Sequence, residues 1–508
     1  MLYKNFLVVV CMFLLVFSSA SLAQVKKNSS VIYVSPAGSD KNNGNFNTPF
    51  KTIQKAINEA SSGEDIEIRK GVYEEAIDIN KSGHENDYFS ISNYNNEKVI
   101  IDGSDREVKH GQSGLINIRN KSWVSIKGLE LKNFFSKSTD VPVGIYVSGY
   151  GDNITLENNH IHNIETHFKG CRGNALGIAI YGSNGNKSIN NIKIRGNELN
   201  NLKTGCSESL SINGNVNNFL IESNYIHNNN NIGIDIIGYE GVSPNPNTDR
   251  AGKGIIRSNT IHHISSAYNS AYYEDTYGKR VYAAGGIYVD GGYDVLIEKN
   301  RIHHVDIGIE LASEHRGRNT ENVTVRNNVL YNNNVVGISI GGYNKNVGGT
   351  VGSKIINNTL YRNDTQNTWT GEFQIQHNVK DNIFKNNIMV VNDQGIFITH
   401  LGEDNINPVE MDYNLYYQGG YRQGNPIILW NGQEYNYLGY FQRKTGNSKN
   451  SVYRTYGALF DENDMQFELS NMSYAIDKGL NFSFSGLKDF HDKPRIKGQK
   501  IDIGATEF

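Results

Sequence analysis

Short runs of alternating hydrophobic and polar residues fill most of the chain between residues 140 and 400. Each run ends at Asn or Gly, and apolar residues in this region do not follow a helical spacing. The alternation predicts strands with one buried and one outward face. One form of the run ends in two Asn-like residues and then Ile-His or Leu-Tyr, as in 154–162, 219–227, 255–262 and 295–303. A second form begins with Gly-Ile, as at Gly233, Gly286, Gly308 and Gly337.

An Asn recurs at one place in this repeat: Asn159, Asn197, Asn224, Asn259, Asn300, Asn328, Asn358 and Asn387. Successive members are 27 to 41 residues apart, which is typical of solenoid coils with loop insertions. A β-sandwich also has many short strands, but it would not repeat one Asn at one corner. Stacked coils would, because each Asn side chain can bond its equivalent one coil along. We therefore predict an all-β fold, a right-handed parallel β-helix, in which Asn224, Asn259, Asn300, Asn328 and Asn358 stack.

Residues 24–508 are predicted to form a single domain. Its parts are an N-terminal cap with the first coils, the regular coils and the C-terminal coils with their cap, at 31–135, 140–400 and 401–508. Residues 52–60 place Ile53, Ala56 and Ile57 on one helical face, so a short helix is expected to cover the open end. First strands are expected at 31–34 and 65–68. The irregular aromatic stretch 430–441 is expected to pack on the solenoid side or to cap its far end.

The N-terminus has the order of a secretory signal peptide. Residues 1–23 contain Lys4, then an apolar run, then small residues that end at Ala23. The apolar run is shorter than the ~20 residues that a spanning helix needs. We predict cleavage near Ala23 and a secreted or periplasmic protein without a membrane span.

Composition narrows the remaining classes. The 508 residues carry a formal net charge of -3, so no basic footprint for nucleic acid is expected. The 30 Tyr and 20 Phe can build a core. Export would leave two cysteines, Cys171 and Cys206, which either pair or remain free thiols. A monomer is expected.

Both ends of the chain carry a family resemblance. It rests on 33–40, 48–56 and 71–73 near the start, and on 475–479 and 502–505 near the end. These segments resemble secreted right-handed β-helix proteins of the pectin-lyase superfold, over nearly the whole mature chain. The resemblance implies the fold, export and a polysaccharide or oligosaccharide partner. Members of that superfold include polysaccharide lyases, glycoside hydrolases and epimerases, so the resemblance alone does not choose an activity.

Aligning the Gly-Ile strands by their Gly, with Ser209-Leu210-Ser211 placed among them, predicts an outward column of Ala179, Ser211, Asp235, Tyr288, Glu310, Ser339, Gln374 and Phe397. Asp290 falls one outward step beyond Tyr288. Parallel strands lie about 4.8 Å apart, so Asp235 and Glu310 should be about 10 Å apart with Asp290 diagonally between them. Insertions at 241–250 and at the Tyr-rich 267–282 adjoin these strands, as expected of a binding site. The alternative is a solvated acidic face.

Candidate site residues follow from this column and the insertions beside it. We predict Asp290, Glu310 and Asp235 as catalytic. We predict contacts with substrate for Glu314, His315, Arg316, Tyr288, Tyr239 and Tyr273. Metal ligands are left unassigned. His162, His227, His262 and His303 share one repeat position, so a corner stack explains them better than a metal site does.

Three functions fit these residues. A glycoside hydrolase needs paired carboxylates and no cofactor. A polysaccharide lyase acting on uronic-acid polymers needs a base and often Ca²⁺, with Tyr288, His315 or Arg316 as the base. Pectate lyases that resemble this chain use a strand Lys, whereas Ser339 stands where that Lys might be sought, and a tight Asp cluster is missing. A non-catalytic carbohydrate-binding solenoid would not require the acids. We favour the hydrolase.

Overall fold

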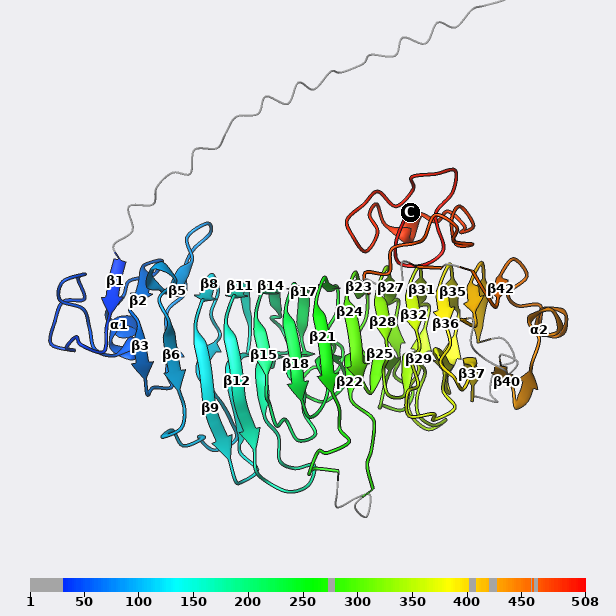
Figure 1. The fold of residues 1–508 in the computed structure, drawn as a ribbon. Coiled ribbons are helices and arrows are strands. Elements are labelled where there is room, and N and C mark those ends of the chain that lie inside the picture. The colour runs from blue at the N-terminus through cyan, green and yellow to red at the C-terminus, as the bar shows by residue number, and fades with distance from the viewer. Residues whose placement is uncertain (1–30, 273–278, 402–407, 420–426, 458, 461–464) are drawn as a thin grey trace, which may run out of the picture.

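The computed structural model describes residues 31–508 apart from 273–278, 402–407, 420–426, 458 and 461–464. The predicted signal peptide at 1–23 and the predicted substrate contact Tyr273 lie outside the described residues. The described chain winds into a parallel β-helix, seen from the side in Figure 1. Three sheets of 13 strands run along the helix, and the chain passes through them in turn. The predicted solenoid is confirmed.

Sheet A begins each coil and contains β1 (Val31–Val34), β2 (Asp65–Ile68), β5 (Phe89–Asn93), β8 (Val124–Lys127), β11 (Gly151–Glu157), β14 (Ile189–Arg195), β17 (Val216–Glu222), β20 (Ile255–Arg257), β23 (Leu296–Glu298), β27 (Thr324–Arg326), β31 (Lys354–Ile356), β35 (Asn382–Lys385) and β38 (Val409–Asp412). Sheet B follows and contains β3 (Gly71–Tyr73), β6 (Val99–Asp102), β9 (Glu130–Ser136), β12 (His160–Thr166), β15 (Glu198–Asn200), β18 (Tyr225–Asn229), β21 (Thr260–Ile264), β24 (Arg301–Val305), β28 (Val329–Tyr331), β32 (Thr359–Tyr361), β36 (Ile388–Val390), β39 (Leu415–Tyr417) and β42 (Val452–Arg454). Sheet C completes each coil and contains β4 (Ile77–Ile79), β7 (Gln112–Arg119), β10 (Val141–Ser148), β13 (Leu176–Gly182), β16 (Leu210–Gly214), β19 (Ile234–Ile237), β22 (Gly285–Asp290), β25 (Ile307–Ala312), β29 (Val336–Ile340), β33 (Phe373–Ile375), β37 (Ile396–His400), β40 (Ile427–Trp430) and β41 (Gln433–Tyr435). A small fourth sheet contains β26 (Thr320–Glu321), β30 (Thr350–Val351) and β34 (Val379–Lys380).

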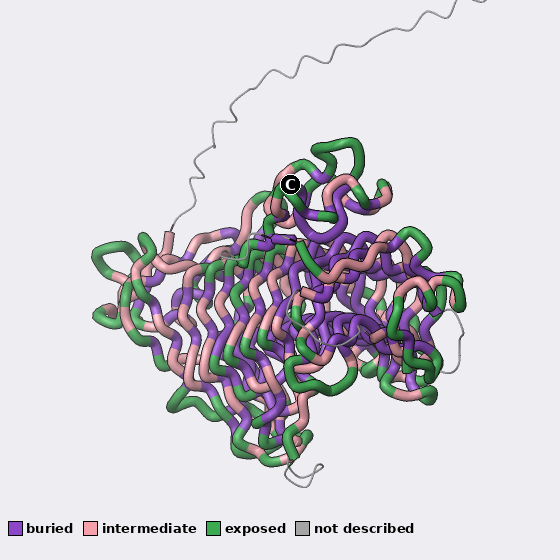
Figure 2. Tube along the Cα trace, turned by 45° about the vertical axis from the view of Figure 1, so that its right-hand side comes forward, coloured by how far each residue is buried: buried purple, intermediate pink, exposed green. Residues whose placement is uncertain are grey.

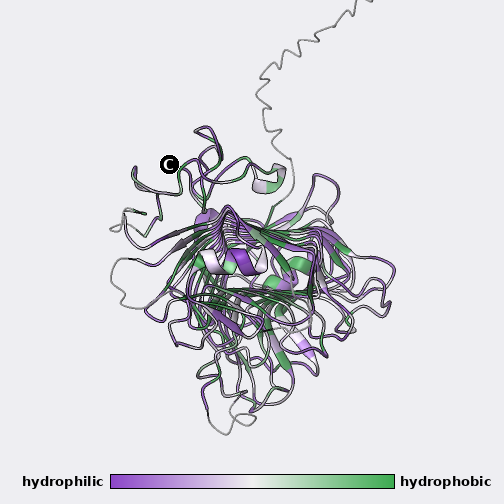
Figure 3. Ribbon diagram, turned by 90° about the vertical axis from the view of Figure 1, so that its right-hand side faces the viewer, coloured by the Kyte–Doolittle hydropathy of each residue, from purple (hydrophilic) through white to green (hydrophobic). Residues whose placement is uncertain are grey.

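The alternation of the sequence produces the core. Inward Ile, Val, Leu and Phe side chains from all three sheets form one continuous buried cluster along the coils. Buried and exposed stretches alternate along the coils in Figure 2. In Figure 3, which looks along the solenoid, the sheets surround this interior and long loops project at its corners. The inner side chains therefore fix the register, and the outward side chains are free for other roles.

The predicted Asn ladder stands at the turn from sheet A to sheet B. The side-chain amide of Asn224 donates to Asn259 Oδ1 at 3.0 Å, and Asn300 donates to Asn328 Oδ1 at 3.0 Å. The same bond recurs from Asn159 to Asn414. Each Asn also bonds backbone groups of neighbouring coils, so the ladder satisfies buried polar groups at a tight corner.

Helices close both ends of the solenoid. Helix α1 (Ile53–Glu59) begins after Thr52 and buries Ile53, Ala56 and Ile57, as predicted. At the far end, the rings of Trp430 and Phe441 lie 5.6 Å apart within the core, with Phe441 on α2 (Leu438–Thr445). The aromatic stretch 430–441 thus caps the end.

The C-terminal part of the chain first completes the coils and then leaves them. In the described residues, the three sheets end at β38, β41 and β42, and the chain after Arg454 turns back along the outside (red in Figure 1). Phe467 and Ile503 of this segment pack with Val329 and Ile388 on the outer face of sheet B. The segment contains a short 3₁₀ helix at 483–485, and another 3₁₀ helix lies early in the chain at 94–96. No helix in the described part of the chain is long and apolar enough to span a membrane.

Candidate functional site

The predicted acids lie on the outward face of sheet C. Asp235 of β19 is the Cα partner of Tyr288 on β22, and Tyr288 is the partner of Glu310 on β25. Their neighbours along each strand, such as Ile236, Val289 and Leu311, point into the core. Asp290 follows Tyr288 by two residues and faces the same way. The structure thus brings Asp235, Asp290 and Glu310 onto three successive strands of one face.

Although they point outward from the solenoid, two of these acids are buried. Asp235 is 3% exposed and Asp290 is 5% exposed, while Tyr288, on the strand between those of Asp235 and Glu310, is 8% exposed. Loops at both edges of sheet C cover them. The alternative of a solvated acidic face is therefore wrong for Asp235 and Asp290.

Burial and mutual repulsion raise the pKa values of these acids. Burial raises the pKa of Asp235 well above its usual range, and the charges of Glu208, Asp290, Glu314 and Glu310 add to this. Asp235 Oδ1 has no hydrogen-bond partner among the described residues. Because no donor reaches that oxygen, little stabilises the charged form of Asp235.

The other two acids differ from Asp235. Burial raises the pKa of Asp290 well above its usual range, although the backbone N–H of Glu314 donates to Asp290 Oδ1 at 2.9 Å and opposes the shift. Burial, followed by the charge of Glu314, raises the pKa of Glu310 to about 7. Glu310 is therefore the acid of this column that ionises near neutral pH.

Glu208 is a further buried acid that the sequence reasoning missed. It precedes β16, is 8% exposed, and burial raises its pKa to about 7, with Glu240 and Glu314 adding to the shift. The predicted outward positions lie within strands, whereas Glu208 precedes the strand that carries Ser211. Its place directly before Ser209-Leu210-Ser211, a run assigned to the same column, is the signal that could have found it.

Another carboxylate and an imidazole extend the acidic group at the edge that leads to sheet A. His315 Nε2 lies 3.0 Å from Glu240 Oε1. One ligand atom from each of Glu240, Asp290 and His315 lies within 4.8 Å of the others, so these three could hold a metal ion. Two carboxylates with an imidazole suit Zn²⁺ or Mn²⁺ better than Ca²⁺, which prefers oxygen ligands alone.

A pocket of about 280 Å³ adjoins this group. It is lined by Tyr239, Pro246, Asp249, His315, Arg316 and Arg318. The Tyr239 ring lies between two guanidinium groups, at 5.4 Å from Arg250 and 5.1 Å from Arg318. The predicted contacts Tyr239, His315 and Arg316 therefore line one cavity, and Glu314 joins it to Asp290 through the backbone.

The Tyr-rich insertion lies at the opposite edge, in the segment 265–284 between sheets B and C. Burial raises the pKa of Tyr272 to about 12, and the charges of Glu208 and Glu314 contribute, so Tyr272 lies within the field of the acids. Tyr268 instead is 67% exposed, with Arg280 at 4.5 Å from its ring. Tyr272, not Tyr268, is thus the described Tyr of this insertion that reaches the site.

A disulfide fixes the same edge. Cys171 and Cys206 are paired, with Cα atoms 5.1 Å apart. Cys206 lies two residues before Glu208, and Cys171 Sγ lies 3.9 Å from the carbonyl oxygen of Ala271. Of the two states the sequence left open, the paired one holds, and it ties Glu208 to the Tyr272 loop.

Two other sequence expectations have clear outcomes. Phe397 is not in the outward column: Gln374 pairs with Thr399, and Phe397 is buried, with its ring 5.2 Å from that of Tyr416. The register shifts between Ile396 and Ile398, so counting from Gly395 fails there.

The predicted His stack is confirmed, because the His262 ring lies 5.1 Å from that of His227 and 4.9 Å from that of His303.

The fold and the acidic sheet define a class of protein, the parallel β-helix with a site on one sheet. Residues 32–175 match the family model described as "Pel9A-like, right handed beta helix region", which agrees with the predicted hand. A pectate lyase of Emericella nidulans, PEL9, is 32% identical over 144 residues, or 25% of this chain and 33% of that protein. The solved structure of a GH136 lacto-N-biosidase from Eubacterium ramulus is similar with a TM-score of 0.53 at 14% identity, over 84% of this chain and 68% of that one. At that identity the likeness shows the fold, which carbohydrate-active enzymes share.

One relative extends over most of the chain. The uncharacterized protein YwoF of Bacillus subtilis (strain 168) is 37% identical over 433 residues, covering 85% of this chain and 89% of the relative. The chain belongs to the family of YwoF.

Proposed function

We propose that this protein is a glycoside hydrolase that cleaves a polysaccharide or oligosaccharide outside the cell. The observation that carries the proposal is the buried acidic group on sheet C. In the described part of the chain, no Lys or Arg forms an ion pair with Asp235, Asp290, Glu310 or Glu208. Structural carboxylates are usually buried with a cation or with several donors, and this group has neither.

Hydrolysis of a glycosidic bond needs one carboxylic acid and one carboxylate at a set distance. Asp290 and Glu310 are one strand and one same-face step apart, so their Cα atoms are separated by roughly 8 Å. Side chains at this Cα spacing can set their carboxyl groups ~6.5–9.5 Å apart, the carboxyl separation of inverting enzymes, in which a water molecule occupies the space between them. We infer inversion of configuration.

The two roles follow from the different surroundings of the acids. Glu310, whose pKa is about 7, supplies the carboxylate that takes a proton from the attacking water. Asp290, with a pKa raised well above the usual range, supplies the proton to the leaving oxygen. Asp235, whose pKa is also raised well above the usual range, lies buried on the next strand with its Oδ1 unpartnered among the described residues, and it completes the acidic group around the pair.

This assignment does not use a metal ion. A cation held by Glu240, Asp290 and His315 would keep Asp290 ionised and remove its proton. Chelation is therefore predicted to leave the rate of a hydrolase unchanged.

A polysaccharide lyase is the second candidate, and the Pel9A-like match at 32–175 favours it. A lyase needs a base that removes a proton from the sugar ring. Tyr288 is poorly suited, because burial raises its pKa well above the usual value and keeps the phenol protonated. Arg316 and His315 line the adjacent pocket and remain the candidates for that base.

The test is incubation with a panel of plant and microbial polysaccharides, with two readouts. New reducing ends without unsaturated products support hydrolysis, and products with the ultraviolet absorbance of an unsaturated uronate support a lyase. Asp290→Asn and Glu310→Gln should each lose about 10²–10⁴-fold in rate. Asp381→Asn, which alters an exposed acid far from sheet C, is the matched control. Near-wild-type turnover by both amide variants would remove these acids from the mechanism, whereas the absence of products from every polysaccharide would favour the non-catalytic binding solenoid.

A further inference from the structure

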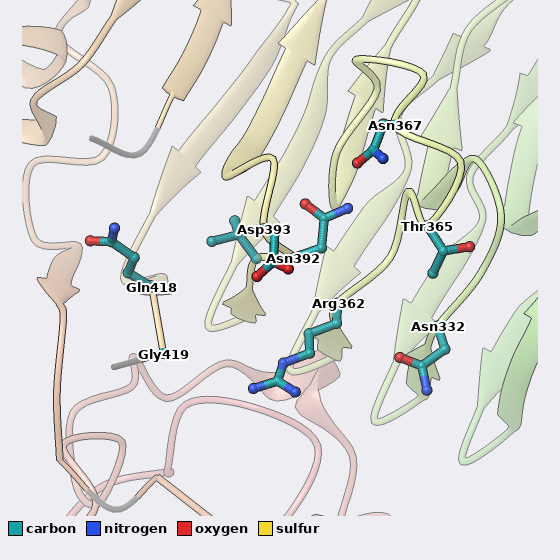
Figure 4. Close-up of a pocket in the computed structure, with 9 residues that line it drawn as sticks. Asn332, Arg362, Thr365, Asn367, Asn392, Asp393, Gln418 and Gly419 are labelled. Carbon is teal, nitrogen blue, oxygen red and sulfur yellow. The ribbon is translucent and has the colours of Figure 1, made fainter. Parts of the chain in front are cut away.

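A second, larger pocket opens beyond the acidic group, at the edge where sheet B leads into sheet C. Its volume is about 460 Å³, and its polar lining includes Asn332, Arg362, Thr365, Asn367, Asp393 and Gln418. Figure 4 shows these side chains arranged around the cavity, on the successive loops after β28, β32, β36 and β39. None of these residues takes part in the site described above.

Two charged side chains of this pocket do not pair. Within the described residues, neither the guanidinium of Arg362 nor the carboxylate of Asp393 forms an ion pair or a side-chain hydrogen bond. The Arg362 guanidinium lies over the ring of Tyr361, 5.0 Å from its centroid. Donors and acceptors that face a cavity without partners are available to a ligand rich in hydroxyl groups.

The loop that carries Arg362 has an unusual backbone. Arg362, Asp364, Asn367 and Trp369 all have positive φ, from 52° at Arg362 to 70° at Trp369. This conformation suits Asn but is unfavourable for a bulky residue such as Trp. The loop keeps it because Asp364, 1% exposed, accepts bonds from the backbone N–H groups of Thr368, Thr370 and Gly371. The loop is therefore built to hold one shape, and such strain gathers at functional sites.

The same loop carries an aromatic ring beside the pocket: Trp369 Nε1 donates to the side-chain oxygen of Gln394, the residue after Asp393, at 3.2 Å. Trp369 is 53% exposed, and its carbonyl oxygen accepts a bond from Thr399 Oγ1 at 2.7 Å. Thr399 belongs to the outward column of Glu310, through Ser339 and Gln374. It lies three strands beyond Glu310, which corresponds to roughly 14 Å along the solenoid. A fixed, exposed indole offers a flat apolar face to a sugar ring.

We propose that Trp369, Arg362 and Asp393 form an accessory subsite for one sugar residue of an extended polysaccharide, whose scissile bond lies over the acidic column. Trp369 stacks on the ring, while Arg362 and Asp393 bond its hydroxyl or carboxylate groups. The subsite rests on the proposed function in requiring a glycan substrate, but not on which acids cleave it. A substrate must be long enough to span both places, so the enzyme favours polymers over short oligosaccharides.

Binding is tested without cleavage in a Glu310→Gln background. The probes are polygalacturonan, rhamnogalacturonan, alginate, xylan and arabinogalactan, each cast in a native gel so that binding retards the protein. The polymer that retards the parent protein should bind Trp369→Ala roughly tenfold or more weakly. Trp369→Phe keeps a ring and should retain most of the binding. Arg362→Ala should also bind more weakly, whereas Tyr437→Ala, which removes an exposed ring near α2, should behave as the parent.

Kinetics with Glu310 intact give a second readout. Trp369→Ala should raise KM for the polymer about tenfold and leave the turnover of the shortest cleaved oligosaccharide unchanged. Equal retardation of Trp369→Ala, Arg362→Ala and the parent, or no retardation by any of the five polymers, would overturn the subsite. Melting temperatures identify any variant that is misfolded, and the Trp369→Phe and Arg362→Ala variants then decide. If Glu310→Gln keeps full turnover while Trp369→Ala loses polymer binding, the proposed active site fails and the subsite stands.

Discussion

Replacing Glu310 by Gln should stabilise the protein at alkaline pH while it abolishes activity. Burial raises the pKa of Glu310 from 4.5 to about 7, so the folded state resists ionisation that the unfolded chain accepts. Below about pH 4 both states are protonated and the carboxyl has no differential effect. As the pH rises through 4.5 towards 7 and above, the wild type loses stability, whereas the Glu310→Gln variant has no carboxyl to ionise and keeps its stability.

The magnitude follows from the two pKa values. Each pKa unit corresponds to about 1.36 kcal/mol, so a rise from 4.5 to about 7 amounts to roughly 3 kcal/mol. Glu310 keeps some solvent contact, which makes this an upper value. Glu310→Gln should therefore match the wild type at pH 4 and exceed its free energy of unfolding by up to about 3 kcal/mol at pH 8.

The assay is urea unfolding at pH 4, 6 and 8, followed by circular dichroism. Glu372→Gln is the contrasting variant, because this fully buried acid accepts bonds from Asn363 N at 2.9 Å and Asn363 Nδ2 at 2.6 Å. An amide there loses an acceptor, so Glu372→Gln should be less stable than the wild type, with turnover per folded molecule unchanged. If the free energy of unfolding of Glu310→Gln does not exceed that of the wild type at pH 8, the surroundings do not destabilise the ionised form of Glu310. The basis for its role near neutral pH is then refuted.

The remaining predictions concern the pH dependence of the rate, the effect of metal ions on the rate, and the stability that the Asn ladder and the disulfide contribute. The rate should rise as the pH increases through about 7, where Glu310 ionises, and a pH–rate profile that is flat there would contradict its role as base. EDTA and added Ca²⁺ should leave the rate of washed protein unchanged, whereas a calcium-dependent lyase would lose and regain activity. Asn300→Ala leaves the backbone carbonyl of Ile256 and two ladder neighbours without their bonds. The free energy of unfolding, measured in urea, should therefore fall by roughly 2–4 kcal/mol. A loss below about 0.5 kcal/mol would show that the ladder does not stabilise the fold. Replacing Cys171 and Cys206 by Ser opens a loop of 35 residues and should lower the free energy of unfolding by roughly 3–4 kcal/mol. Equal midpoints of urea unfolding for the wild type with and without reductant would contradict this.

The fold could be predicted because each coil repeats the same physical solution. Asn224 and Asn259 bond one another only if their coils stack in register, so a recurring Asn reveals the stacking directly. The C-terminal segment has no such repeat. Phe467 and Ile503 cover sheet B through apolar contacts that leave no periodic pattern in the sequence, so the path of this segment along the outside could not be predicted.

The site could be predicted only as far as the strands are regular. Asp235 and Glu310 were found because period-two alternation fixes the face of each residue. Glu208 enters the site from a turn, and a turn has no period from which its direction can be read. Burial was missed for a related reason, since it depends on loops whose path over sheet C the sequence does not specify.

Burial is also what separates a catalytic group from a charged surface. On an open strand, Asp235 and Asp290 would be hydrated and ionised, and neither could donate a proton at neutral pH. Buried as they are, Asp235 and Asp290 have pKa values raised well above the usual range, beside a Glu310 whose pKa is about 7. The disulfide and the Tyr272 loop exclude water from this part of sheet C. In the proposed mechanism, this exclusion gives acids of similar intrinsic strength different pKa values, so that Asp290 donates a proton and Glu310 accepts one. Loss of that cover should therefore lower activity before it unfolds the coils, because the core of the solenoid does not depend on it.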